Sequence, residues 1–330
     1  MTVALIFRKK NPAFFSIERV FARLEPELEK KTAIRKVIAP QLGISFRNIM
    51  ATSSFVKKNK ADLYHITGDI HYAALGLPRR RTLLTIHDCV FLYQTKGWKR
   101  LILKKLLLDW PVRRSAMVTT ISEASKKDIL KYTGCAPDKV VVIPNPVNDQ
   151  IRYRPHEFNS SEPVILFVGA TPNKNLPRVI QALENIPCRL LIVGAIPDPA
   201  RELLHRHGVA YQQKTGLDDE GLAACYADAD MVLFPSTFEG FGLPILEAQK
   251  AGRPVITSNI SPMKEVAGNG ACLIDPLSVP SIRDGVLHVI KDATYRMQLV
   301  NAGFENIDRF DVKVIAQQYM NCYQALYSRL

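Results

Sequence analysis

The sequence predicts an α/β fold made of two doubly wound, parallel-sheet domains in series. The chain has 330 residues and is 47% apolar, which is enough for two cores and too long for one comfortable doubly wound sheet. Short β-branched or leucine-rich runs alternate with longer amphipathic stretches, the pattern of parallel sheets covered by helices on both faces. After IPNPVN (143–148) comes a polar stretch without periodicity, DQIRYRPHEFNSSEP, which we interpret as the linker.

The first domain is expected over residues 1–150. Its strand candidates are short runs of β-branched and leucine residues, at 3–7, 35–39, 63–66, 82–86, 117–121 and 140–143.

The second domain is expected over residues 151–330. Its strand candidates are 164–168, 189–193, 231–234, 254–257 and 271–274, with helical patterns at 174–185, 218–226 and 243–251. Residues 311–330 have helical spacing and are expected to form a closing helix. The sequence leaves open on which of the two domains this helix packs. Ligands of open parallel sheets bind beyond the carboxyl ends of the strands, so two Rossmann-like sheets are expected to face a central ligand cleft.

The composition excludes several classes of protein. The longest apolar runs, VILFVGA at 164–170 and LLIVGAI at 190–196, are far shorter than the roughly 20 residues of a membrane-spanning helix. The N-terminus lacks a small-residue cleavage site, so we expect a cytoplasmic protein. The six cysteines occur singly, without the spacing of zinc sites or redox motifs. We therefore expect neither a metal nor a cofactor.

Charge is distributed unevenly. Residues 1–150 hold 27 Lys and Arg against 12 Asp and Glu, a net +15, whereas residues 151–330 hold 17 against 19, a net −2. The basic residues of the first half occur in clusters, which favours an anionic partner: a membrane surface, a lipid-phosphate acceptor or a nucleic acid. The alternative is a solvated basic surface.

The most specific segment is MVLFPSTFEGFGLPILEAQKAGRPVI, residues 231–256. A buried strand ends at Pro235, a loop carries Glu239, and a helix starts near Leu243. Gly240 and Gly242 let the backbone approach a ligand closely, and free N–H groups at a helix start can hold phosphate or hydroxyl oxygens. Glu239 and a second glutamate, Glu247, could each accept hydrogen bonds from a vicinal diol. Alternatively, Glu239 caps the turn and Glu247 lies on an exposed helix face.

This segment resembles the retaining family 4 glycosyltransferases of the GT-B fold, whose signature is a glutamate pair at this spacing around a glycine-rich turn. The resemblance extends to ILFVGATPNKNLPRVIQAL (165–183) and PVITSNISPMKEVAGNGACLIDP (254–276) in the second domain. It is weaker in the first domain, where it rests on TIHDCVFLY (85–93), TTISEASKKDIL (119–130) and VVIPNPVN (141–148).

The resemblance implies a metal-independent transfer of a hexose from a nucleotide-diphosphate sugar, of the GDP-mannose or UDP-hexose type, to a glycan or lipid-linked acceptor in bacterial-type polysaccharide or glycolipid synthesis. It implies that Glu239 holds the donor sugar, Glu247 the ribose, and Lys174 the leaving diphosphate. The same donor site would include Gly169, Asn173, Gly240 and the amides of Phe241, Gly242 and Leu243. Independently of any family, a departing diphosphate gains negative charge, which a lysine and aimed backbone dipoles stabilise. An ordinary solvated lysine is the alternative for position 174.

His87 follows the strand at 82–86 and matches a histidine of the family, so it is a candidate for contact with the donor sugar or the reacting centre. Asp88 orients it or caps the next turn. In the family's front-face mechanism the leaving phosphate takes the acceptor proton, so neither of these residues is assigned as a general base. His65 and His71 are further candidates for the cleft.

The sequence departs from the family at three places. Arg8-Lys9-Lys10-Asn11 replaces a Gly-Gly loop, so Arg8, Lys9 and Lys10 are assigned to the acceptor or membrane side. Ala170 stands where a phosphate-binding arginine is frequent. Pro146 replaces a glycine and stiffens the hinge.

Residues 97–114, GWKRLILKKLLLDWPVRR, combine a leucine-rich face with basic residues. This composition suits a helix lying in an anionic membrane interface, through Lys99, Arg100, Lys104 and Lys105, or a buried core helix. Three other functions stay open: a GT-B nucleotide-sugar epimerase, a pyridoxal-dependent phosphorylase, and a basic nucleic-acid-binding protein. Since no recognition module for nucleic acid is visible, no nucleic-acid partner is expected.

Overall fold

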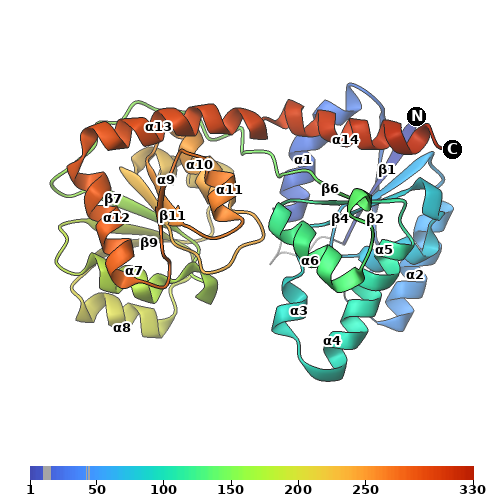
Figure 1. Cartoon of the computed structure of the whole chain (residues 1–330), viewed down its shortest axis with the longest axis horizontal. Helices are drawn as coiled ribbons and strands as arrows, with labels where there is room; N and C mark the ends of the chain where they lie inside the picture. The colour runs from blue at the N-terminus through green and yellow to red at the C-terminus, as the bar shows by residue number, and fades with distance from the viewer. Residues whose placement is uncertain (10–15, 42, 44) are drawn as a thin grey trace. The chain divides into compact units, whose positions relative to one another are not determined.

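The computed structural model describes residues 1–9, 16–41, 43 and 45–330, and the chain forms two compact units (Figure 1). Unit 1 comprises Met1–Pro146 and Asp311–Leu330, and unit 2 comprises Val147–Phe310. The sequence placed the division at 150/151 and grouped residues 311–330 with the second domain. In the structure the division lies at 146/147, and the closing helix belongs to unit 1.

Unit 1 contains a parallel sheet whose described strands run in the order β2-β1-β3-β4-β5-β6. The strands are β1 (Thr2–Phe7), β2 (Ala33–Ile38), β3 (Leu63–Ile66), β4 (Thr82–Ile86), β5 (Met117–Thr120) and β6 (Val140–Val142). The helices are α1 (Ser16–Glu29), α2 (Phe46–Lys58), η1 (His71–Gly76), η2 (Arg79–Arg81), α3 (Val90–Gln94), α4 (Gly97–Lys104), the π-helical η3 (Lys105–Asp109), α5 (Trp110–Arg113), α6 (Glu123–Thr133), η4 (Pro137–Lys139) and α14 (Val312–Tyr327).

Alternation along β1 builds the two cores of unit 1. Val3, Leu5 and Phe7 pack with α1 and α14 on one face, and Ala4 and Ile6 pack with α2, η1 and η3 on the other. Figure 1 shows α14 beside α1.

Unit 2 contains a second parallel sheet, in the order β12-β11-β10-β7-β8-β9. Its strands are β7 (Val164–Val168), β8 (Arg189–Val193), β9 (Ala210–Lys214), β10 (Met231–Phe234), β11 (Val255–Ser258) and β12 (Cys272–Ile274). Its helices are η5 (Pro172–Lys174), α7 (Leu176–Leu183), α8 (Asp198–Arg206), α9 (Asp219–Asp228), α10 (Leu243–Lys250), α11 (Met263–Ala267), α12 (Val279–Lys291), α13 (Ala293–Ile307) and η6 (Asp308–Phe310).

Local sequence explains where several helices begin and end. Ser122 Oγ accepts a hydrogen bond from the Ser125 N–H at the start of α6, and Gly134, with φ +64°, ends that helix. Asp218 caps α9 through the Gly221 N–H at 2.8 Å.

The strand order locates the candidate ligand sites. The order of unit 1 reverses between β1 and β3, and that of unit 2 reverses between β7 and β10. At such switch points the loops beyond the carboxyl ends diverge to opposite faces and leave room for a ligand. The candidate ligand sites therefore lie in the segments that follow β1, β3, β7 and β10.

Candidate functional site

The turn after β7 carries Gly169, Asn173 and Lys174. Gly169 has φ +87°, and its N–H donates to the Val193 carbonyl oxygen at 2.7 Å. A Cβ atom at position 169 would lie 3.0 Å from Cε of Lys174, closer than ordinary van der Waals contact. Glycine is needed here because the lysine side chain lies back across the end of β7.

Lys174 and Glu239 join the two loops of the switch point. Lys174 Nζ lies 2.6 Å from Glu239 Oε1 and 4.5 Å from the ring centre of Phe234. Asn173 Nδ2 donates to the same carboxylate oxygen at 3.1 Å. The side chains of Lys174 and Glu239 are 17% and 15% exposed, so their charges are less screened than those of a surface pair.

The loop from Pro235 to Gly242 is fixed by its contacts to the neighbouring turn. Asn175 is buried, with φ +71°, and its side-chain amide donates to the carbonyl oxygens of Pro235 and Pro276 at 3.1 and 2.6 Å. The Thr237 N–H donates to the Asn173 carbonyl oxygen at 2.8 Å. These bonds fix the loop that carries Glu239.

The loop ends at the start of α10. Gly242 has φ +118° and precedes Leu243, the first residue of the helix. Phe241 is buried and packs edge-on against Phe310, with ring centres 5.9 Å apart. Of the two glycines of this turn, Gly242 therefore has a backbone conformation that glycine favours, and Gly240 is half-buried beside Glu239.

Glu247 lies in α10 and is 6% exposed. Its Oε2 accepts a hydrogen bond from the Tyr226 hydroxyl at 2.8 Å. Burial and the charge of Glu247 raise the pKa of Tyr226 well above its ordinary value, so the phenol stays protonated and donates. The alternative of an exposed helix face for Glu247 is excluded. Sequence reasoning missed Tyr226, because no motif signals a hydroxyl on the preceding helix.

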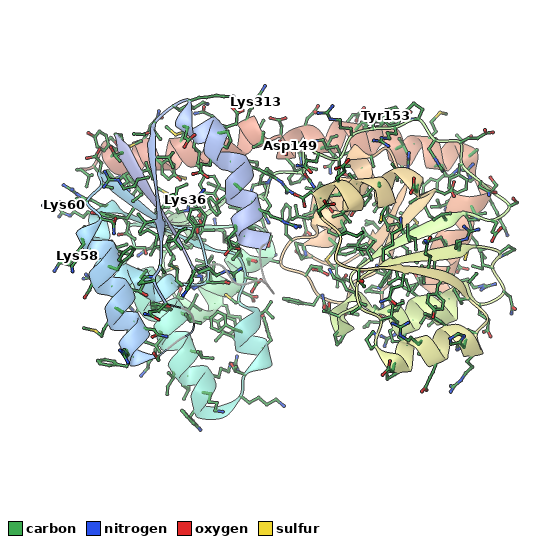
Figure 2. The ribbon with its side chains drawn as sticks, turned by 180° about the vertical axis from the view of Figure 1, so that it is seen from behind. Lys36, Lys58, Lys60, Asp149, Tyr153 and Lys313 are labelled. Atoms are coloured by element: carbon green, nitrogen blue, oxygen red, sulfur yellow. The ribbon has the colours of Figure 1, made fainter. Side chains whose placement is uncertain are left out.

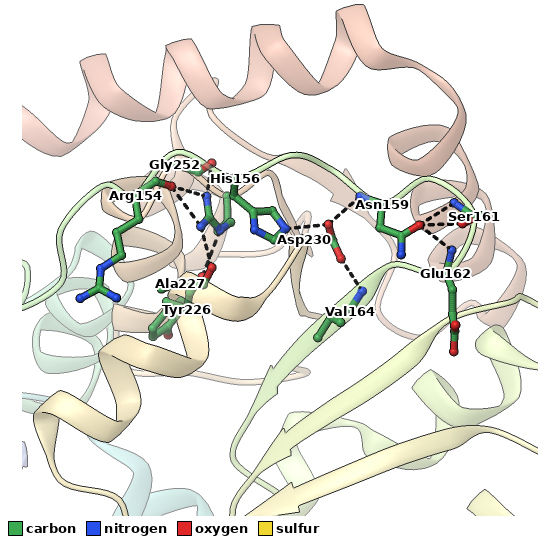
Figure 3. A network of polar contacts seen from close by, with 11 residues as sticks. Arg154, His156, Asn159, Ser161, Glu162, Val164, Tyr226, Ala227, Asp230 and Gly252 are labelled. Atoms are coloured by element: carbon green, nitrogen blue, oxygen red, sulfur yellow. Dashed lines mark hydrogen bonds and ion pairs between the residues drawn. The ribbon is translucent and has the colours of Figure 1, made fainter.

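A buried polar network supports Tyr226 (Figure 3). Arg253 is 3% exposed and donates to the carbonyl oxygens of Tyr226, Ala227 and Arg154, at 3.0, 2.8 and 3.2 Å. Asp230 is also 3% exposed and accepts from His156 Nε2, the Asn159 N–H and the Val164 N–H. The two side chains fasten the linker to the end of α9 and the start of β7. Asp230 therefore has a structural role in this network.

His87 lies at the carboxyl end of β4 in unit 1. Its Nε2 is 2.8 Å from the Thr67 carbonyl oxygen, which assigns a proton to Nε2 and leaves Nδ1 as the acceptor of the neutral ring. A Cβ atom at Gly68, which has φ +145°, would lie 2.8 Å from Cδ2 of His87. Burial lowers the pKa of His87, so the ring is neutral near pH 7. Asp88 accepts from the Val90 N–H and caps α3, as one of its two interpretations expected.

Arg8 lies at the switch point of unit 1, directly after β1. It pairs with Glu18 at 2.7 Å and with Asp69, which has φ +50° and directly follows Gly68. The hydrogen bond to Glu18 raises the pKa of Arg8. Lys9 is exposed, and Lys10 lies outside the described residues. The first basic cluster is thus not a uniform cationic surface, because two carboxylates hold Arg8.

Two histidine candidates are corrected. His65 is fully buried, with Nδ1 2.7 Å from the Tyr323 hydroxyl and Nε2 2.7 Å from Thr85 Oγ1, and burial lowers its pKa to about 3. His71 is buried, with Nδ1 2.7 Å from the Leu107 carbonyl oxygen. Both rings fill polar positions inside unit 1, so neither lines a ligand site.

The helix predicted at 97–114 divides into two parts. In α4 no residue is buried, and Trp98, Leu101 and Ile102 are 68%, 62% and 46% exposed. Leu107, Leu108 and Val112, further along, are buried in the core. The buried-core alternative therefore holds for the second part of this helix, whereas α4 is exposed.

The basic residues of this helix do not join Arg8 and His87 in one cluster. They lie on α4 and η3, which pack on α3 and α6. Lys104 pairs with Asp109 at 2.9 Å, Arg100 lies over the Tyr132 ring, and Lys99 and Lys105 are exposed.

The described residues offer neither a metal-binding group nor a membrane-spanning helix. They contain no group of three or more His, Cys, Asp or Glu side chains arranged to hold a metal ion. None of the helices within the described ranges has the length and apolar content needed to cross a membrane.

Comparison with known families matches both halves of the chain. Residues 11–151 match the family model Glycosyltransferase Family 4, and residues 149–306 match Glycosyl transferases group 1.

Several curated proteins are similar in sequence. O-antigen chain mannosyltransferase B of Escherichia coli is 27% identical over 279 residues, covering 76% of this chain and 72% of that protein. MMP alpha-(1->4)-mannosyltransferase of Mycolicibacterium hassiacum is 25% identical over 286 residues, covering 80% and 69%. O-antigen chain mannosyltransferase RfbU of Salmonella typhimurium is 30% identical over 207 residues, covering 60% and 57%.

Solved structures share the fold. WaaG, a glycosyltransferase involved in lipopolysaccharide biosynthesis, has a TM-score of 0.74 at 16% identity, covering 98% of this chain and 99% of that one. Anabaena HepE in complex with UDP and glucose has a TM-score of 0.77 at 18% identity, covering 98% and 100%.

Proposed function

Because a Glycosyltransferase Family 4 domain and a Glycosyl transferases group 1 domain together span residues 11–306, the chain belongs to this family of GT-B glycosyltransferases, and we propose that it transfers a hexose from a nucleotide-diphosphate sugar to a glycan or lipid-linked acceptor. The relatives named above are mannosyltransferases, which supports mannose as the sugar and GDP-mannose as the first donor to test. The O-antigen relatives support a role in polysaccharide synthesis.

One observation carries the proposal: Lys174 and Glu239 form an ion pair across the switch point of unit 2. A sugar nucleotide presents a diphosphate, which needs a cation, next to hydroxyls, which need a hydrogen-bond acceptor. Each of these two side chains supplies one requirement. When the donor binds, the diphosphate takes Lys174 and the sugar hydroxyls take Glu239, so the ligand replaces an ion pair that already holds both groups in position.

The remaining donor contacts follow from the same geometry. The glycine turn at 240–242 and the first amides of α10 face the sugar and the diphosphate, and Glu247, oriented by Tyr226, takes the ribose hydroxyls. As the bond to the sugar breaks, the leaving diphosphate gains charge that Lys174 and the backbone N–H groups stabilise. Transfer with retention of the anomeric configuration, and without a metal ion, completes the proposal. His87 offers a neutral imidazole to a hydroxyl of the donor sugar or the acceptor.

The experiment that tests this function is a thermal-shift panel of UDP, GDP, ADP, TDP and CMP with their sugar nucleotides, each with and without EDTA. A ligand that binds only the folded protein raises its melting temperature. We expect a shift with one diphosphate and its sugar nucleotide that persists in EDTA. Folded protein that shifts with none of them would contradict the proposal, and a shift that EDTA removes would contradict metal independence.

We also propose that α4 touches an anionic membrane. Trp98, Leu101 and Ile102 are exposed on a helix that carries Lys99 and Arg100 and is followed by Lys105, the combination of an interfacial helix. Replacing Lys99, Arg100 and Lys105 by Gln should release the protein from phosphatidylglycerol vesicles. The matched control removes the same charge from unit 2 with Arg206, Lys264 and Lys291 changed to Gln. Equal binding of the two variants would refute the contact.

A further inference from the structure

A second cluster of positive charge lies at the edge of the unit 1 sheet opposite to His87. His87 follows the carboxyl end of β4, whereas η2 (Arg79–Arg81) directly precedes the amino end of the same strand. The end of α14 contacts η2 there, and brings Arg329 to the same place. Residues from the first quarter of the chain and from its last turn thus meet at one edge.

These residues enclose a depression of about 380 Å³. Its lining consists of Arg79, Arg80, Ala116, Leu326 and Arg329. Leu326 is 1% exposed and forms an apolar wall, and the three arginines are exposed to solvent at its sides. The volume is in the range of small-ligand sites, which run from roughly 300 to 1,000 Å³.

The arginines of the depression form no ion pair with the carboxylates that the structure describes. Within the described ranges of the chain, none of Arg79, Arg80 and Arg329 has a carboxylate within salt-bridge distance. Arg8, Lys36, Lys104 and Lys174 do have such partners. The depression therefore brings together three exposed guanidinium groups that form no ion pair with a described carboxylate.

Lys139, at the end of η4 and directly before β6, lies in the electric field of the same arginines. Burial lowers its pKa, and repulsion by the Arg79 guanidinium lowers it further. The charge of Lys139 therefore lies close enough to Arg79 for the two cations to repel each other. A bound anion would relieve that repulsion.

We propose that this pocket is a second anion site, which binds a phosphate or diphosphate group through Arg79, Arg80 and Arg329. Guanidinium groups form paired hydrogen bonds with phosphate oxygens, and three of them around an apolar wall suit a compact, multiply charged group better than a single carboxylate. The phosphate belongs to a soluble phosphate compound or to a lipid headgroup, both of which present the same oxygens. This site is separate from the donor site of unit 2 and does not depend on the proposed sugar transfer.

The test is calorimetric binding of inorganic pyrophosphate at low ionic strength to three variants. The triple variant R79Q/R80Q/R329Q removes the pocket charges. Its matched control is K57Q/K58Q/K60Q, which removes the same charge from the end of α2, where Lys58 and Lys60 lie together (Figure 2). The third is K174A, which weakens pyrophosphate binding to the donor site and leaves the pocket intact. Equal melting temperatures check that all are folded.

We expect K174A and the α2 variant to retain the pyrophosphate site of the arginine pocket. At this site R79Q/R80Q/R329Q should bind pyrophosphate at least tenfold more weakly. A second arm uses phosphatidylcholine vesicles with and without phosphatidic acid. These variants are compared in a K99Q/R100Q/K105Q background, which removes the charges of α4. If the triple variant alone loses binding to phosphatidic acid, and pyrophosphate competes with the vesicles for the background protein, the source is a headgroup. Unchanged binding of both probes by the triple variant, or an equal loss in the α2 variant, would overturn the proposal.

Discussion

Lys174 is the side chain on which the proposed chemistry depends most. Its Nζ is held 2.6 Å from Glu239 and its chain lies across Gly169, so the ammonium is in position before the diphosphate arrives. K174A removes charge stabilisation of the leaving group, and we predict that turnover falls at least about tenfold, or roughly 1.4 kcal/mol of transition-state stabilisation.

Steady-state kinetics with the donor found in the thermal-shift panel measure this change. Lys291, an exposed lysine at the end of α12, provides the control K291A, which should behave as wild type. Wild-type turnover in K174A would remove Lys174 from the site.

Tyr226 is predicted to act through Glu247. The phenol donates to Glu247 Oε2 from a fully buried position, so Y226F leaves the shape of the core unchanged and removes one bond that orients the carboxylate. We expect KM for the sugar nucleotide to rise roughly three- to tenfold while kcat changes little, because the ribose is remote from the breaking bond. Y211F, at a half-buried tyrosine of β9, is the control. A fall in kcat with unchanged KM would argue against this role.

At this scale the sequence predicted the residues that motifs mark and missed those that only packing defines. Lys174, Asn173 and Glu239 are brought together as expected, because strand ends and glycine turns constrain where they point. The Tyr226 hydroxyl and the burial of His65 follow from the contact of segments far apart in the sequence, which no local pattern shows.

The linker clasp is the set of hydrogen bonds that Arg253 and Asp230 form with their partners. It holds the linker against the end of α9 and the start of β7 in unit 2. D230N removes the charge that accepts from His156, Asn159 and Val164, and we predict that the free energy of unfolding of unit 2 falls by about 2 kcal/mol or more. Hydrogen exchange of peptides that cover 159–168 measures the loss. D228N, at an exposed neighbour, is the control. Equal protection in the two variants would contradict the clasp.

The stability of unit 1, and with it the packing of α14 inside this unit, should depend on pH through His65. The ordinary pKa of histidine is about 6.5, whereas that of folded His65 is about 3. Between these values the unfolded chain binds the extra proton, so the stability of unit 1 falls as the pH falls, by about 1.4 kcal/mol per pH unit for this group. The lowered pKa values of His71 and His87 add to the loss with the same sign.

Urea unfolding between about pH 7 and pH 5 checks this dependence. The two tryptophans of the chain, Trp98 and Trp110, both lie in unit 1 and report its unfolding by fluorescence. H65Q should show a weaker dependence than wild type. A wild-type unit 1 that is equally stable at both ends of this range would contradict the prediction.

At the level of elements, periodicity predicted the buried strands of both sheets and missed β9. Its sequence, AYQQK, is largely polar because β9 is an edge strand, paired only with β8. The closing helix was predicted as a helix, but its spacing gives no partner. Its contacts with α1 and β3 decide that it belongs to unit 1.

For the whole molecule, charge and chemistry are divided between the units. Unit 2 contains the Lys174–Glu239 pair, whereas the clusters of basic residues that give the first half its net +15 lie in unit 1, on α2, η2 and α4. The charge asymmetry in the sequence correctly distinguished the halves. It did not show that the unit 1 charges separate into a paired Arg8, a helix with exposed aromatic residues and an unpaired arginine pocket.

The measurement that tests the central claim most directly is the release of nucleoside diphosphate from the sugar nucleotide by wild type, E239Q and E265Q. E265Q changes an exposed glutamate of α11 and serves as the control. If Glu239 holds the sugar, E239Q releases the diphosphate at least about tenfold more slowly while it binds the free diphosphate at least as tightly as the wild type, because Lys174 no longer pairs with a carboxylate. E265Q matches the wild type. Release by E239Q at the wild-type rate would contradict the account.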